Sequence, residues 1–93
     1  MRFMQRLSAA AQQRLTRTWA RMQPDEAQKR LRDLQIVDVR QPHEFNGPLG
    51  HLEGAVLVPL NQLSARLQEL DPSAPTLVVC RSGMRSSRAC GVL

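Results

Sequence analysis

Short apolar runs alternate with amphipathic segments along most of this chain of 93 residues. Three runs rich in valine, leucine and isoleucine, at residues 36–39, 55–58 and 76–79, have the composition of buried parallel strands. Between them stand two segments with apolar residues at helical spacing. Residues 24–34 open with a proline and two acids, and residues 61–70 open with an asparagine that we expect to be the N-cap. This alternation predicts an α/β fold with a mainly parallel sheet flanked by helices.

The N-terminal segment differs from the rest of the chain in both pattern and charge. Apolar side chains recur at steps of three and four between residues 3 and 22, which predicts an amphipathic helix; a short strand over Thr18–Met22 is the alternative. Residues 1–23 carry five arginines and no acid, whereas the charges of residues 24–93 cancel. We therefore divide the chain into a basic N-terminal extension, residues 1–23, and a single domain, residues 24–93.

Three uses of the extension fit its composition. We favour a segment that packs against the domain or is a frayed extension, because such compositions are common in arginine-rich proteins. Contact with a membrane surface and an organelle-targeting leader are the alternatives. The chain shows no signal-peptide pattern and no apolar run of membrane-spanning length, and two thiols in such a chain suit a reducing compartment. We therefore expect a cytoplasmic protein with free thiols.

Composition also argues against two other classes of function. The aromatic residues are Phe3, Trp19 and Phe45, too few for a base-stacking platform, so we expect no nucleic-acid partner. The two cysteines are too few for a zinc site and lack histidine partners.

Cys80 is the strongest candidate for chemistry. It follows the third apolar run and precedes a polar loop with Gly83, after which residues 86–93 are expected to begin a helix. In open α/β sheets, ligands bind beyond the carboxyl ends of the strands. Loop N–H groups, the positive helix end and the charges of Arg81 and Arg85 would all favour the thiolate over the thiol. The alternative is a buried cysteine that only fills space at a strand end.

Three segments of the chain resemble the rhodanese superfamily. Residues 36–45 are similar to its signature (I/V)-D-(V/A)-R-x-x-x-E-(F/Y), and residues 50–55 are similar to G-H-I-P-G-A. Residues 80–86 resemble its active loop C-R-S-G-x-R-S. The three segments stand in the order and spacing of that family. Glu53 occupies the position where the family usually has proline, a departure that we expect to alter only a turn.

The resemblance implies a sulfurtransferase with a double-displacement mechanism. Cys80 would take the sulfane sulfur of thiosulfate or a persulfide donor and pass it to cyanide, a thiol or a sulfur-acceptor protein, without a metal or organic cofactor. Arg85 would orient the anionic donor and Arg81 would line the pocket. The implied site consists of the nucleophile Cys80 and the substrate-binding residues Arg81, Ser82, Gly83, Met84, Arg85 and Ser86.

Other polar residues are interpreted as structural. Asp38, Arg40 and Glu44 match positions of the first signature, and Arg40 and Glu44 are spaced so that they can pair and fix a loop. His43 and His51 have no ligand cluster around them in the sequence, and we assign neither a catalytic role.

Cys90 and the end of the chain leave two questions open. We expect Cys90 to pack within its helix, with a resolving thiol as the alternative. Members of the resembled family continue beyond this point with another strand and helix. The sequence therefore predicts that the last strand and helix are missing, with low stability or pairing to another chain as the result.

Two other functions compete with an active sulfurtransferase. One is a low-activity sulfur-relay or binding module. The other is a cysteine-based phosphatase or arsenate reductase, because related folds use a loop with cysteine and arginine. Four residues separate Cys80 from Arg85, whereas the phosphatase pattern has five, so the spacing favours sulfur chemistry.

Overall fold

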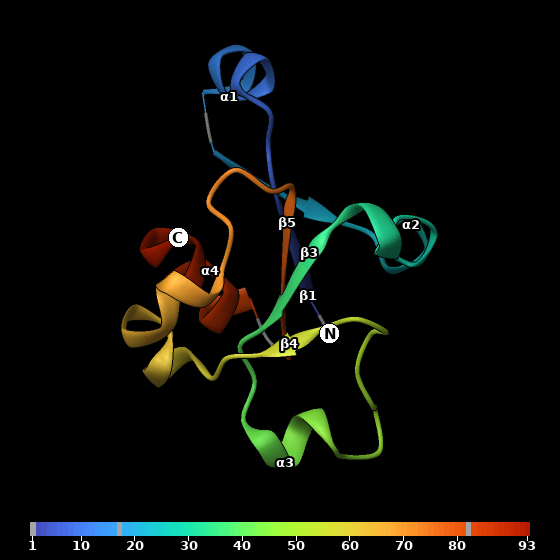
Figure 1. The fold of residues 1–93 in the computed structure, drawn as a ribbon. Coiled ribbons are helices and arrows are strands. Elements are labelled where there is room, and N and C mark those ends of the chain that lie inside the picture. Colours follow the sequence, from blue (N-terminus) through green and yellow to red (C-terminus); the bar gives the residue numbers. More distant parts are fainter. Residues whose placement is uncertain (1, 17, 82) are drawn as a thin grey trace.

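A five-stranded sheet with helices on both faces forms the frame of this computed structural model (Figure 1). The structure describes residues 2–16, 18–81 and 83–93, and the side chains of residues 83–87 lie outside that description. The strands are β1 (Arg2–Arg6), β2 (Trp19–Met22), β3 (Gln35–Asp38), β4 (Val56–Leu57) and β5 (Thr76–Cys80), in the order β2-β1-β5-β3-β4. β5, β3 and β4 pair in parallel, and β1 pairs antiparallel with both β2 and β5. The predicted α/β class is confirmed, and the sheet is mixed because the β2-β1 half is antiparallel.

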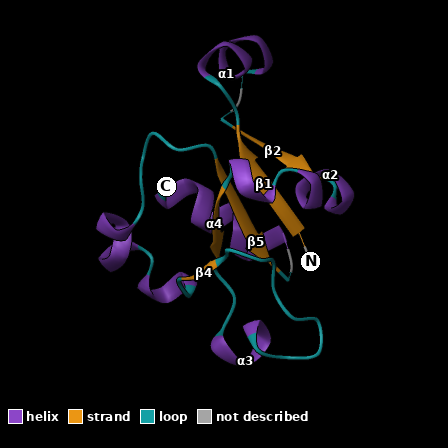
Figure 2. Ribbon diagram, turned by 45° about the vertical axis from the view of Figure 1, so that its right-hand side comes forward, coloured by secondary structure: helices purple, strands orange, loops and turns teal. Residues whose placement is uncertain are grey.

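The helices are short and cover both faces of the sheet. They are α1 (Ala9–Leu15), α2 (Pro24–Lys29), α3 (Pro42–Phe45) and α4 (Gly83–Val92), with the 3-10 turns η1 (Leu31–Asp33), η2 (Leu60–Gln62) and η3 (Ser64–Glu69). α2 lies on one side of the sheet and α4 on the other, while α1 stands away from the body (Figure 2). Within the described ranges, no helix has the length and apolar character needed to cross a membrane.

Two apolar layers, one on each face, hold the sheet between the helices. The layer under α2 consists of Phe3, Met22, Ala27, Leu34, Ile36, Leu77 and Val79. The layer under α4 consists of Val37, Val39, Val58, Leu63, Val78, Cys80 and Ala89. Successive side chains of a strand point to opposite faces, so β3 and β5 each contribute to both layers. All five residues of β5 are buried, and Cys80 faces the α4 layer.

The helix predicted for residues 3–22 is wrong, because this segment forms β1, α1 and β2. Phe3 belongs to the α2 layer and Met4 packs against the α4 layer, an arrangement that requires the period of a strand. Pairing with β5 also satisfies main-chain groups that a helix would leave open at the edge of that strand. The alternative strand near Thr18–Met22 is confirmed by β2.

Three smaller predictions are also corrected. Asn61 lies inside η2 and is not an N-cap, and residues 61–70 form 3-10 turns, with a break at Arg66 where φ is −115° and ψ is 16°. The expected loop after β3 begins with α3 instead. α4 starts at Gly83, earlier than the expected helix of residues 86–93. The three predicted strands are found as β3, β4 and β5.

Candidate active site

The carboxyl ends of β3 and β5 lie side by side and carry the candidate chemistry. Asp38 pairs with Val79 in the parallel register, and the Val39 amide donates to the Val79 carbonyl at 3.0 Å. Cys80 is therefore the last residue of a central strand, and its side chain is fully buried. α4 begins three residues later, so the positive end of its dipole lies at the loop that follows Cys80.

The structure describes the predicted site residues to different extents. Cys80 ends β5, and Arg81 follows it with an exposed side chain. Ser82 lies outside the described residues. Gly83 is the first residue of α4, and the main chain of Met84, Arg85 and Ser86 forms the next positions of that helix, while their side chains lie outside the description. The structure thus brings together Cys80, Arg81 and the start of α4.

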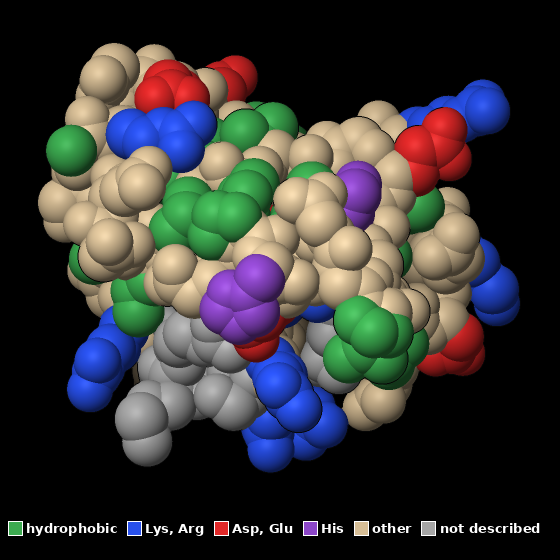
Figure 3. All heavy atoms as spheres, turned by 90° about the horizontal axis from the view of Figure 1, so that it is seen from below, with side chains coloured by type: hydrophobic (Ala, Val, Ile, Leu, Met, Phe, Trp, Pro, Cys, Tyr) green, Lys and Arg blue, Asp and Glu red, His purple; other side chains and the backbone are tan. Residues whose placement is uncertain are grey.

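A pocket of about 250 Å³ lies beside Arg81. Its remaining lining residues come from α3 and the loop after it, and are His43, Glu44, Gly47, Pro48 and Leu49. Figure 3 views the molecule from this side, where histidine, arginine and apolar side chains reach the surface. Sequence reasoning missed these residues as site residues. The signal that finds them is the parallel pairing of β3 and β5, because loops at the carboxyl ends of neighbouring strands converge.

The lining residues that accompany Arg81 all lie within residues 43–49, and we call this segment the pocket wall. The buried ion pair of Arg40 and Asp38 lies beside this wall. The two side chains are 1% and 0% exposed. The Arg40 Nε donates to both Asp38 oxygens at 2.9 and 3.1 Å, and Nη2 donates to Oδ2 at 2.8 Å. The same guanidinium donates to the Gly50 carbonyl at 2.7 Å and to the Glu44 carbonyl at 3.4 Å. The contact with residue 44 is thus to its main chain, and the carboxylate that pairs with Arg40 is that of Asp38.

Further contacts stiffen the same wall. The Glu44 carboxylate accepts from the Gln41 amide at 3.0 Å, which closes the first turn of α3. The His51 ring stacks on Phe45 with centroids 3.6 Å apart, and its Nδ1 lies 2.9 Å from the Phe45 carbonyl oxygen. His51 is therefore engaged in holding the loop. His43, in contrast, lines the pocket that Arg81 shares.

Cys90 packs where the sequence placed it, on the inner side of α4 against the layer that contains Cys80. The structure joins neither Cys80 nor Cys90 in a disulfide. Burial raises the pKa of Cys90 to about 12, the nearby Cys80 adds to the rise, and Arg6 opposes it. Cys90 is therefore a protonated thiol at neutral pH and a poor nucleophile. This supports the packing role over the resolving thiol.

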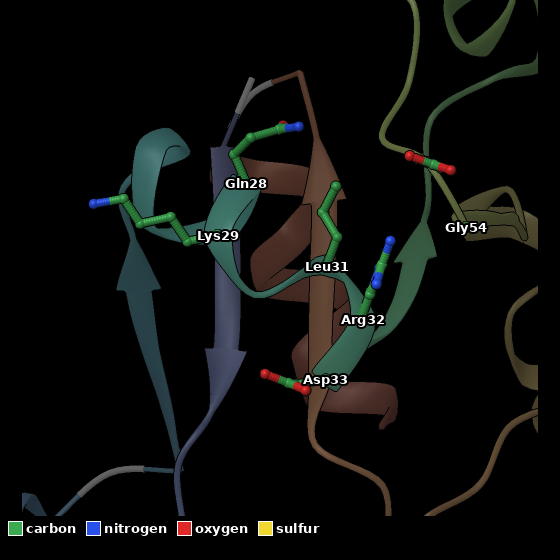
Figure 4. Close-up of a pocket in the computed structure, with 7 residues that line it drawn as sticks. Gln28, Lys29, Leu31, Arg32, Asp33 and Gly54 are labelled. Carbon is green, nitrogen blue, oxygen red and sulfur yellow. The ribbon is translucent and has the colours of Figure 1, made fainter.

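A larger cavity, of about 550 Å³, lies beside η1 and the turn at Glu53 and Gly54. Its lining carries both signs of charge, and Figure 4 shows Lys29 and Arg32 extending in different directions, so the charges do not converge. Its described lining residues include no cysteine, serine or histidine. Among the described residues, no group of three histidine, cysteine or acidic side chains is placed to hold a metal ion.

Comparison with known proteins agrees with this geometry. Residues 23–93 match the family model of the Rhodanese-like domain. The chain is 38% identical over 82 residues to "Uncharacterized protein YqhL" of Bacillus subtilis (strain 168), covering 88% of this chain and 61% of that protein. It is 33% identical over 61 residues to a "Sulfurtransferase" of Allochromatium vinosum, covering 66% and 55%. It is 36% identical over 56 residues to "Putative sulfur carrier protein YrkF" of B. subtilis, covering 60% and 29%. The chain thus spans less than two thirds of the length of each of these relatives.

Proposed function

Since this chain belongs to the rhodanese-like family, we propose that it is a sulfurtransferase that carries sulfane sulfur as a persulfide on Cys80. The observation that carries the proposal is the position of Cys80, at the carboxyl end of the central strand and directly ahead of α4. Main-chain N–H groups at a helix start favour an anion, which is the form of both a thiolate and a persulfide.

The reaction has two steps in this proposal. The Cys80 thiolate attacks the outer sulfur of thiosulfate and forms a new S–S bond. The original S–S bond breaks, and sulfite leaves with its electron pair. Cyanide or a thiolate then attacks the outer sulfur of the persulfide, and Cys80 leaves as a thiolate. Covalent capture divides one difficult transfer into two easier ones. Neither step uses a metal or an organic cofactor.

The neighbours of Cys80 have separate roles in this scheme. Arg81, exposed at the pocket, attracts the anionic donor, and Arg85 orients it. Gly83, Met84 and Ser86 at the start of α4, together with Ser82, would bind the transferred sulfur through main-chain N–H groups. Two cysteines that are not joined in a disulfide fit a reducing compartment such as the cytoplasm, and we propose that location.

Intact-mass analysis after incubation with thiosulfate tests the proposal. The wild-type protein and Cys90→Ser should each gain the mass of one sulfur atom, and cyanide should remove it with release of thiocyanate. Cys80→Ser should gain nothing. An unchanged mass in folded wild-type protein, or an equal adduct on Cys80→Ser, would contradict a persulfide on Cys80. Hydrolysis of a phosphate ester in place of sulfur uptake would favour phosphatase chemistry.

A sulfur-relay module without efficient turnover is the second candidate. The observation that favours it is similarity to a protein named as a putative sulfur carrier. A relay module would form the one-sulfur adduct and lose it in a single turnover to a thiol, but it would show no steady thiocyanate production. Steady turnover with cyanide would favour the enzyme.

A further inference from the structure

We propose that Arg2 is a further anion-binding residue of the Cys80 site, where it attracts anionic reactants from the β1 side of the sheet. The inference rests on the proposed function, because the reactants concerned are those of Cys80. The sequence analysis placed Arg2 in a separate N-terminal extension and gave it no part in the site. The pairing of β1 with β5 brings the two residues together.

The register of the β1–β5 pair gives the first argument. Arg2 lies directly opposite Cys80 in this antiparallel pair. Residues directly opposite each other point to the same face of a sheet, with Cβ atoms about 4.5–5.5 Å apart. Met4 and Val78, the opposite pair two residues along, both contact the α4 layer. Because side chains alternate along a strand, Arg2 and Cys80 face the α4 side together.

Burial and the position of α4 give the second argument. The Cys80 side chain is fully buried, whereas Arg2 is exposed. α4 begins three residues after Cys80 and packs against both β5 and β1. The N-terminus of the chain lies at the same end of the sheet as the carboxyl end of β5 (Figure 1). Arg2 is thus a solvent-exposed cation directly beside a buried thiol.

The distribution of charge gives the third argument. β1, β2, β5 and α4, which surround Arg2, contain no acidic residue. On the other side of β5, the Asp38 carboxylate of β3 is already paired with Arg40. Within the described ranges, neither of the two ion pairs includes Arg2. The charge of Arg2 therefore adds to the positive end of the α4 dipole and is available to an anion.

A second arginine shows what a merely solvated cation looks like in this sheet. Arg21 of β2 is exposed and lies opposite Met4, so it faces the same side as Arg2. Two strand spacings put β2 roughly 10 Å from β5, a distance at which salt at about 0.1 M screens most of a charge. Arg2 and Arg21 thus differ in their distance from Cys80, and they share charge, face and exposure.

Alkylation of Cys80 by iodoacetate and by iodoacetamide tests the assignment without any sulfur transfer. Both reagents alkylate a thiolate with loss of iodide, but only iodoacetate is an anion. The ratio of their rate constants at neutral pH, followed by the mass of the peptide that contains Cys80, measures the local positive charge. Arg2→Gln should lower the ratio of iodoacetate to iodoacetamide by about two- to fivefold, and the matched control Arg21→Gln should change it by less than about 1.3-fold.

Arg2→Lys separates the charge of the side chain from its packing. Lysine keeps the cation, so the alkylation ratio should stay within about 1.5-fold of wild type, in protein shown to be folded by circular dichroism. A residue that only held β1 in place would change both rate constants equally and leave their ratio unchanged.

The sulfur-transfer reaction provides a second measurement, with cyanide as the acceptor. Arg2→Gln should raise the KM for thiosulfate at least as much as it lowers the alkylation ratio, because thiosulfate is a dianion and iodoacetate a monoanion. The kcat should stay within about twofold of wild type, since the loss concerns the attraction of the donor.

The outcomes separate this inference from the proposed function. An unchanged alkylation ratio in Arg2→Gln, or an equal fall in Arg2→Gln and Arg21→Gln, overturns the role of Arg2 whether or not Cys80 forms a persulfide. A fall confined to Arg2→Gln, in protein that gains no sulfur from thiosulfate, supports the anion-binding role and overturns the proposed function. Failure of both reagents to modify Cys80 in folded wild-type protein overturns both.

Discussion

Two arginine–carboxylate pairs of nearly equal length lie in very different surroundings. Arg40 and Asp38 meet at 2.8 Å with side chains 1% and 0% exposed, while Arg66 and Glu69 meet at 2.7 Å with side chains 31% and 43% exposed. Arg40 of the first pair also donates to the carbonyls of Glu44 in α3 and of Gly50. The second pair joins neighbours within η3, and Arg66 makes one longer contact, at 3.3 Å, with the Leu57 carbonyl. The contrast teaches that burial, and not the ion-pair distance, decides how much of the structure depends on a pair.

The exposed pair still perturbs its own titration. The hydrogen bond from Arg66 lowers the pKa of Glu69, and the hydrogen bond to Glu69 raises the pKa of Arg66. Because both groups are open to solvent, salt screens the attraction and little stability follows. The buried pair has no such freedom, since removal of either partner leaves a charge without its counterpart inside the protein.

Replacement of Arg40 is the change with the largest expected effect. Arg40→Met leaves the Asp38 carboxylate buried and unpaired, so the free energy of unfolding should fall by roughly 3–5 kcal/mol. Urea unfolding measures the loss, with Arg66→Met as the exposed counterpart that should unfold almost as wild type does. The double variant Asp38→Leu with Arg40→Met should recover part of the loss, because no charge is then stranded. Equal midpoints for Arg40→Met and Arg66→Met would break the comparison.

A smaller effect is expected from a methyl group added to the loop that Arg40 holds. In Gly47→Ala the new Cβ would lie 2.8 Å from the His43 carbonyl oxygen and 3.3 Å from the Glu44 carbonyl oxygen. Main chain cannot yield as a flexible side chain does, so unfolding should become easier by roughly 1–3 kcal/mol.

Gly91→Ala is the control for that substitution. Gly91 lies in α4 with open space around it, and alanine there should raise stability by about 0.5–1 kcal/mol. Thermal melting compares the two alanine variants with wild type. If both variants shift the melting temperature in the same direction, the loop is not held against its neighbours as described.

The effect with the narrowest range, confined to alkaline pH, concerns a group whose pKa is moved mainly by burial. The pKa of Cys90 is raised from 9.0 to about 12, so the folded state holds its proton more tightly than the unfolded state does. The stability that Cys90 contributes is therefore fully present below pH 9 and is lost as the pH rises toward about 12.

Urea unfolding at a series of pH values measures this contribution. The difference in stability between wild type and Cys90→Ala should shrink steadily over that alkaline range. Glu69→Gln is the exposed comparison, and its difference from wild type should not change there, because the lowered pKa of Glu69 places its titration at acidic pH. A wild-type to Cys90→Ala difference that stays constant across the alkaline range would contradict the buried thiol.

The apolar pattern along the sequence correctly predicts the three parallel strands β3, β4 and β5. The runs at residues 36–39, 55–58 and 76–79 became strands because their apolar side chains are buried on both faces. Cys80 was placed at a strand end for the same reason. The segment 3–22 was misread because its apolar residues fit both a helical and a strand period, and only β5, distant in sequence, decides between them.

The pocket wall could not be predicted from spacing alone. His43 and Leu49 gain their position from the contact of Arg40 with Gly50 and from the parallel pairing of β3 with β5, both of which are tertiary. The predicted pairing of the Arg40 and Glu44 side chains is wrong for a related reason. Asp38 lies only two residues before Arg40, and the end of the strand turns the Asp38 carboxylate toward the Arg40 guanidinium.

The placement of β5 between β1 and β3 has a consequence for how the protein fluctuates. A strand with partners on both sides and five buried residues opens only when most of the domain opens. Its amide protons should therefore exchange with solvent deuterium among the slowest in the chain, while those of α1, which has no buried residue, exchange among the fastest. The thiol proposed to carry sulfur therefore ends the strand that is expected to open least, so a donor or acceptor would have to reach it there.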